Sequence, residues 1–210
     1  MKGLSTDICT TSSAACLKAA GYEFVVRYYS STTKLPEKVI TAGEALALSQ
    51  NGISICVVYE DLSNIVSYFN GARGKVDGYN AYHFAQNMHQ PPGSAIYFAV
   101  DYDAELADIP GAIQDYFKGI LQGFNDFSGG NPVYDIGVYG SGAVCRWLKN
   151  NLVFVKYTWL AESTGWQGSA SYEDWNLKQS VNSAALCLLG NNWEPCIANG
   201  DFGQFTPGFV

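Results

Sequence analysis

An apolar run followed by a helix-like stretch occurs five times in the first 151 residues, and this alternation constrains the fold more than any other feature. The apolar runs span residues 3–10, 23–30, 52–60, 94–103 and 134–141. They are rich in Val, Ile, Tyr and Phe, which favour strands, and several lack polar alternation, as expected of parallel strands buried on both faces. The pattern therefore predicts a parallel α/β fold.

Helix signals separate these runs. Ser12 or Ser13 can cap a helix that ends at Gly21, and Thr41 with Glu44 three residues later forms a capping box. Further helical patterns span residues 78–89, 111–127 and 143–151. These helices supply the crossover connections that parallel strands need.

The last third of the chain changes character. Three more strand-like runs span residues 156–163, 174–181 and 198–205, and the segments between them are rich in Gly, Ser, Asn and Trp. Five strand–helix units and three further strands give eight strands, which can close into a TIM-like barrel. An open doubly wound sheet is the alternative, but no G-x-G-x-x-G motif follows an early strand. We find no linker or repeat, and we expect residues 1–210 to form one barrel domain.

Polar residues fall at the predicted carboxyl ends of the strands, which meet at one mouth in such barrels. In chain order they are Asp7, Arg27, Glu60, Asp101 with Asp103, Tyr139 with Ser141, Glu162, Gln179 and Asp201. A single carboxylate in such a place is often a helix cap, and Asp7 and Glu60 are open to that interpretation. A helix cap needs only one carboxylate, so the presence of both Asp101 and Asp103 indicates a functional role for this pair. We interpret Arg27 as a counter-charge for this acidic mouth.

Clustered carboxylates either bind metal or cleave glycosides, and the motifs of other sites are missing. The chain has no D-x-D-x-D-G calcium loop, no C-x-x-C pair, no G-x-S-x-G elbow and no histidine at a strand end. A metal-dependent hydrolase is therefore disfavoured, and we expect neither a metal nor another cofactor. Glycosidases instead pair one protonated with one ionised carboxyl. Trp166, in a loop, is a candidate to stack on a sugar ring.

Charge and hydropathy limit the partners. A net charge of −7 is unlike the basic face of a nucleic-acid-binding protein. No run approaches the roughly 20 apolar residues of a membrane span, and no signal peptide is visible. Of the six cysteines, we expect Cys56 to be a buried thiol, whereas Cys187 with Cys196 and Cys9 with Cys16 are candidate disulfides.

The strand ends together resemble a known family. The segments GLSTDICT, FVVRYYS, VVYE, IYFAVDYD, IGVYGSG and WLAE, in this order and spacing, are similar to the glycoside-hydrolase-like domain catalogued as domain of unknown function 1906. That family is related to the glycoside hydrolase family 25 lysozymes. The resemblance implies a flattened barrel of five strand–helix units and three strands. It also implies cleavage of the glycan of bacterial peptidoglycan. We expect a monomer that is secreted or delivered to the cell envelope.

The resemblance also assigns roles. The lysozymes' functional acids correspond to Asp7, Asp101, Asp103 and Asp201, but their general acid is a Glu where this chain has Asp103. The shorter side chain leaves three possibilities: a different substrate, an acid supplied by Glu60 or Glu162, or a barrel that binds glycan without cleaving it. Our leading hypothesis has Asp103 or Glu60 as the acid and Asp101 as the ionised partner. Asp7 orients them, and the substrate is bound by Glu162, Asp201, Arg27, Tyr139, Trp166 and Gln179.

Overall fold

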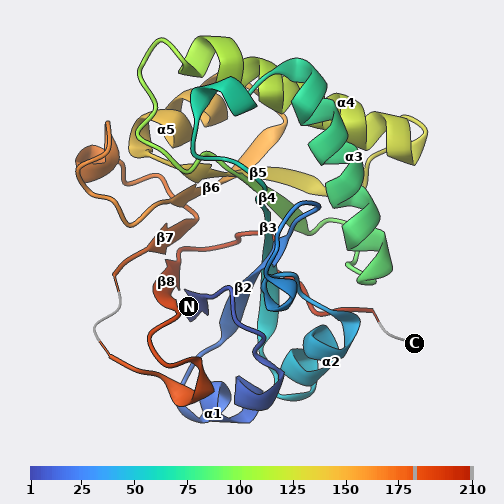
Figure 1. Cartoon of the computed structure of the whole chain (residues 1–210), viewed down its shortest axis with the longest axis vertical. Coiled ribbons are helices and arrows are strands. Elements are labelled where there is room, and N and C mark those ends of the chain that lie inside the picture. The colour runs from blue at the N-terminus through green and yellow to red at the C-terminus, as the bar shows by residue number, and fades with distance from the viewer. Residues whose placement is uncertain (182–183, 209–210) are drawn as a thin grey trace.

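A closed barrel forms the centre of the molecule (Figure 1). A computed structural model describes residues 1–181 and 184–208, and within them eight strands close the barrel. The strands are β1 (Lys2–Ser5), β2 (Phe24–Tyr29), β3 (Ser54–Tyr59), β4 (Ala95–Ala99), β5 (Asp135–Gly140), β6 (Val155–Leu160), β7 (Leu177–Gln179) and β8 (Glu194–Ala198). The helices are α1 (Ala14–Ala19), α2 (Ala42–Gln50), α3 (Gly71–Asn87), α4 (Gln114–Ser128) and α5 (Gly142–Asn151).

Strands and helices alternate from β1 to α5, and the strand order around the barrel follows the sequence. Every neighbouring pair from β1 to β7 is parallel. The helices cover the outside of the barrel, whereas β7 and β8 have no helix beside them in Figure 1. The predicted TIM-like α/β barrel is confirmed.

The position predicted for the eighth strand is wrong. It begins at Glu194 instead of residue 198, and it runs antiparallel to both β1 and β7. Pro195 lies inside it, and proline in a short run argues against a strand. Residues beyond Ala198 instead cross the amino ends of the parallel strands, where Ala95 N donates to Gly203 O at 2.9 Å. The end of the chain therefore closes the barrel opposite the expected mouth.

Alternation along each strand divides the core into two parts. Phe24 and Val26 of β2 and Tyr97 of β4 point into the barrel, where they pack with Phe202 from the closing segment. The residues between them on each strand face the helices and belong to a second, larger cluster. Because successive side chains of a strand point to opposite sides, a residue's parity predicts whether it faces the interior.

Helix α3 begins at Gly71, seven residues before the predicted residue 78. The glycines of its first turns are contact points with α4. A Cβ at Gly74 or Gly78 would overlap the backbone of Tyr116 or Ile120. The missing side chains let the two helix backbones approach closely, which outweighs the low helix propensity of glycine.

We expect Gly74→Ala to lower the free energy of unfolding by about 1–3 kcal/mol, because the added methyl group must push the helices apart. Urea denaturation monitored by circular dichroism measures the effect. Gly43→Ala in α2 is the matched control, since the nearest atom to its new Cβ is 4.0 Å away. That control should raise stability by about 0.5–1 kcal/mol. Equal effects at the two positions would contradict the helix contact.

One disulfide joins Cys16 on α1 to Cys187, so both expected pairings are wrong. Cys9 is an exposed free thiol, and Cys196 lies inside the barrel on β8. The bridged residues are separated by 171 positions in the sequence and meet because β8 pairs with β1. The expected burial of Cys56 is confirmed. In the described part of the chain, no helix has both the length and the apolar character to cross a membrane.

Candidate active site

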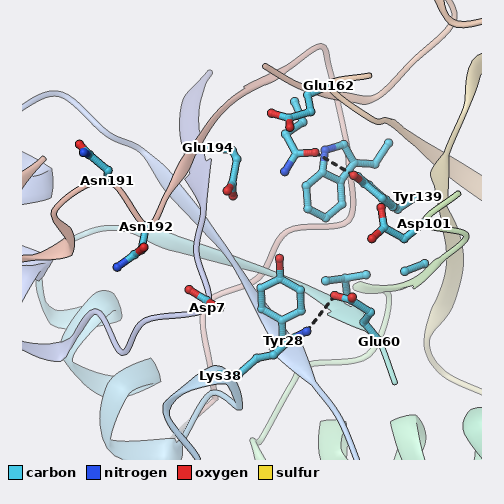
Figure 2. A pocket seen from close by; sticks show the side chains of 14 residues that line it. Asp7, Tyr28, Lys38, Glu60, Asp101, Tyr139, Glu162, Asn191, Asn192 and Glu194 are labelled. Atoms are coloured by element: carbon cyan, nitrogen blue, oxygen red, sulfur yellow. Dashed lines mark hydrogen bonds and ion pairs between the residues drawn. The ribbon is translucent and has the colours of Figure 1, made fainter. Parts of the chain in front are cut away.

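A cavity of about 380 Å³ opens at the carboxyl ends of the parallel strands (Figure 2). Its lining follows the alternation that points every second side chain of a strand into the barrel. Val58 lies in β3 and Glu60 directly after it, and Ala99 ends β4 with Asp101 two residues later. The remaining lining residues are Asp7, Tyr28, Lys38, Tyr139, Trp159, Glu162, Gln179, Asn191, Asn192 and Glu194. Strands β2 to β8, together with the segments after β1, before α2 and before β8, therefore contribute to one site.

Five carboxylates line the cavity, and four of them were expected there: Asp7, Glu60, Asp101 and Glu162. The fifth is Glu194, at the first position of β8. Because β8 is antiparallel, its amino end lies at the mouth, whereas Asp201 follows its carboxyl end. Asp201 accepts a hydrogen bond from Tyr157 Oη at 2.7 Å and does not line the cavity. The expected place of Asp201 at the mouth is therefore wrong.

Lys38 supplies the positive charge of the site. Its Nζ lies 3.1 Å from Glu60 Oε2, an ion pair marked in Figure 2. Burial raises the pKa of Glu60, and the charge of Lys38 acts against this rise. Burial also raises the pKa of Asp101, opposed by Lys38 and by the Tyr139 hydroxyl. The cavity thus holds two neighbouring carboxyls of raised pKa, and the direct ion pair favours the charged form of Glu60.

Glu194 lies on the other side of the cavity. Its Oε2 accepts a hydrogen bond from Ser5 Oγ at 3.0 Å. Burial raises the pKa of Glu194, and the negative charges of Glu162 and Asp7 raise it further, while the hydrogen bond from Ser5 lowers it. The site therefore holds a third carboxyl whose proton is bound more tightly than in the unfolded chain.

Arg27 does not contribute to the mouth, contrary to expectation. It has the parity of the helix-facing side of β2, and its side chain is fully buried under α2. Its Nε lies 2.7 Å from Glu44 Oε1, and its guanidinium also donates to the Thr6 and Glu37 carbonyls. Thr41 caps α2 as predicted, but the side chain of Glu44 binds Arg27 instead of completing the capping box. Arg27 is a structural residue in the layer between barrel and helices.

Asp103 and Trp166 also lie outside the cavity lining. The chain turns away after Asp101, and the exposed carboxylate of Asp103 accepts a hydrogen bond from Gln167 N at 2.8 Å. Asp103 thereby links the loop after β4 to the loop after β6. The ring of Trp166 is half-buried in that second loop. The two acids that appear equivalent in the sequence therefore occupy different environments.

Five residues that line the cavity were not predicted from the sequence: Tyr28, Lys38, Glu194, Asn191 and Asn192. The parity of β2 was a usable signal for Tyr28, because Phe24 and Val26 point inward. Lys38 ends a three-residue 3-10 helix and the two asparagines lie on a loop, and neither segment is long enough for a periodicity to indicate direction. Among the residues that the structure describes, no cluster of three His, Cys, Asp or Glu side chains is arranged to hold a metal ion.

Glu194→Gln should stabilise the folded protein at pH 7. The folded state binds the Glu194 proton more tightly than the unfolded chain does, so ionisation costs stability as the pH rises from about 4 through the raised pKa. The substitution removes this cost at pH 7 and changes little below pH 4, where both states are protonated. Thermal unfolding at both pH values measures the difference, with Glu105→Gln on an exposed loop as the control. A gain at pH 4 as large as at pH 7 would contradict the assignment.

With this geometry established, comparison with known proteins identifies the family. The family model described as "Rv2525c-like, glycoside hydrolase-like domain" matches residues 15–202. The chain belongs to this family. The resemblance seen in the strand ends is thereby confirmed.

Relatives of this Rv2525c-like chain include the uncharacterized protein FadG of Bacillus subtilis, which is 34% identical over 176 residues. The match covers 81% of this chain but only 30% of FadG. The crystal structure of the Tat-secreted protein Rv2525c from Mycobacterium tuberculosis is similar, with a TM-score of 0.73 and 20% identity over 97% of this chain and 98% of that one. GHIP, a glycosyl hydrolase 25 of Streptococcus pneumoniae, has a TM-score of 0.62 and 9% identity over 95% and 87%. At these identities, the solved structures show a shared fold.

Proposed function

We propose that the chain is a glycosidase that cleaves bacterial cell-wall glycan in the cavity at the barrel mouth. The observation that carries this proposal is the pair of half-buried carboxyls, Glu60 and Asp101, whose pKa values are both raised beside one lysine. Glycoside hydrolysis needs one protonated and one ionised carboxyl on the two sides of the scissile bond. Family membership and the fold shared with a glycosyl hydrolase 25 support this reaction class.

The geometry favours Asp101 as the proton donor and Glu60 as the ionised partner. Glu60 has the direct ion pair with Lys38, and Tyr139 donates its only hydroxyl proton to Gln179 at 2.9 Å. A protonated Asp101 can then donate to Tyr139 or to a glycosidic oxygen. This assignment reverses the roles expected from the sequence, and it does not use Asp103. Asp101 protonates the leaving oxygen as the glycosidic bond breaks, while the charge of Glu60 stabilises the sugar cation. A water molecule then adds its oxygen to the cation and releases one proton, which the carboxylates of the site take up.

A glycan-binding barrel without turnover is the second candidate. It is favoured by the position of Asp103, which corresponds to the lysozymes' general acid but lies outside the cavity. For either candidate we propose a location outside the cytoplasm. The disulfide between Cys16 and Cys187 supports this, because disulfides persist in oxidising compartments.

Incubation with purified peptidoglycan, chitin and cellulose separates the two candidates. A glycosidase releases new reducing ends from peptidoglycan, and mass spectrometry of the soluble fragments identifies the broken bond. A binding barrel sediments with the insoluble glycan and releases none. A folded protein that neither binds nor cleaves any of these glycans would contradict both candidates.

A further inference from the structure

A chain of hydrogen bonds crosses the cavity from Asp101 to Glu194. The carboxyl of Asp101 lies beside the Tyr139 hydroxyl, as Figure 2 shows. Tyr139 Oη donates to Gln179 Oε1 at 2.9 Å, and Gln179 Nε2 donates to Ser5 Oγ at 3.0 Å. Ser5 Oγ then donates to Glu194 Oε2 at 3.0 Å. The three intermediate residues come from β5, β7 and β1, so the chain spans the barrel and ends on a carboxyl at each side.

The number of protons in this chain is limited. Each hydroxyl has one proton to donate, and the Gln179 amide has a donor on one side and an acceptor on the other. In the observed direction every donor points toward Glu194, so the first bond is complete only when Asp101 is protonated. Rotating the Gln179 amide by half a turn reverses the direction, and then Glu194 must carry the proton. If both carboxyls are ionised, Tyr139 and Ser5 each donate outward, and the Gln179 oxygen faces a lone pair.

The number of available protons affects stability because the linking residues are buried. Ser5 is fully buried and Gln179 is 7% exposed, so water has little access to replace a lost hydrogen bond. A buried polar atom without a partner destabilises the state that contains it. All four bonds are made only when at least one of the two terminal carboxyls is protonated, because a protonated carboxyl still accepts through its second oxygen.

We propose that Gln179 and Ser5 are positioning residues that couple Asp101 to Glu194, so that once one carboxyl is ionised the other holds its proton more tightly. The inference deepens the proposed function, on which its catalytic meaning rests. When Asp101 gives its proton to a leaving oxygen, Tyr139 can turn to donate to the new carboxylate. The Gln179 amide and the Ser5 hydroxyl then reverse, and Glu194 takes up one proton from water.

Other charged groups also act on the two terminal carboxyls, Asp101 and Glu194. Asp101 faces Lys38 of the segment before α2 and Glu60 after β3. Glu194 faces Asp7 after β1 and Glu162 after β6. Tyr28 of β2 and Cys196 of β8 interact with Glu194 as well. These groups couple through space, so the test must separate their effect from that of the hydrogen-bond chain.

A substrate-free titration separates the two effects. Carbon-13 NMR of labelled side-chain carboxyls gives the titration midpoint of Asp101, and Glu194→Gln is expected to lower it. The same substitution is then made in a Gln179→Met background. This background keeps the side-chain volume and the surrounding charges but interrupts the series of hydrogen bonds. We expect the lowering to fall to about half or less, because only the through-space interaction remains.

Ser5→Ala removes a different hydrogen bond of the same series and should give the same reduction in the lowering. The test can therefore still be made if Gln179→Met does not fold. Ser180→Ala is the matched control, since its exposed hydroxyl is not part of the hydrogen-bond series. In this background Glu194→Gln should lower the titration midpoint of Asp101 by the full amount. An equal lowering in the wild-type and Gln179→Met backgrounds would overturn the proposal. Because no substrate is used, this outcome is distinct from a failure to cleave glycan, which would overturn the proposed function alone.

Discussion

Asp101→Asn lowers the rate of glycan cleavage by about 10²–10⁴-fold in our account, because positioned proton donors contribute effects of that size. The amide matches the carboxyl in shape but cannot protonate a leaving oxygen. Removing a half-buried carboxyl of raised pKa should not reduce stability at pH 7, so the loss cannot be attributed to unfolding. Release of reducing ends from peptidoglycan, with circular dichroism of the same samples, measures the effect.

Two further aspartates are the matched controls for this substitution. Asp103→Asn changes an exposed carboxylate outside the cavity, and Asp201→Asn changes one beyond the carboxyl end of β8. Neither is expected to reduce the chemical step. A variant set in which Asp103→Asn is inactive and Asp101→Asn remains active would contradict the assignment of the donor and support the lysozyme-like role of Asp103.

Glu44→Gln should lower the free energy of unfolding by about 3–5 kcal/mol, because it leaves the charge of Arg27 buried without a partner. Glu44 Oε1 also accepts from Thr10 N at 2.8 Å and from Thr10 Oγ1 at 2.7 Å, so the pair joins the loop after β1, β2 and α2. Urea denaturation measures the loss. Asp115→Asn, which breaks the exposed pair with Lys118, should cost less than about 1 kcal/mol.

The double substitution Arg27→Met with Glu44→Leu distinguishes a structural pair from a functional one. Removing both charges should recover most of the lost stability and leave glycan cleavage intact, since neither residue lines the cavity. If this double variant folds but no longer binds glycan, Arg27 takes part in the site after all.

The sequence predicts most of this site because the period of a strand is regular. The parity that places Val58 and Ala99 inside the barrel also places Glu60 and Asp101 at its mouth. The same rule, applied to β2, places Arg27 on the outside and Tyr28 on the inside, so the error at Arg27 was avoidable. For Asp103 the rule fails, because it holds only while the chain remains extended, and β4 ends at Ala99.

The direction of the last strand could not be predicted in the same way. Nothing in the run EPCIA indicates that it pairs antiparallel with β1, and that pairing decides which end of β8 faces the mouth. Glu194 therefore takes the place that the resemblance to the lysozymes gave to Asp201. The disulfide follows from the same closure, since Cys16 and Cys187 approach only when β8 lies beside β1.

Digestion of purified peptidoglycan in water enriched with oxygen-18 tests the central claim most directly. If the cavity hydrolyses a glycosidic bond, each new reducing end released by the wild-type protein carries one oxygen-18 atom, and the labelled fragments disappear with Asp101→Asn. Intact glycan after incubation with the folded wild-type protein would contradict the claim, as would fragments that carry no label.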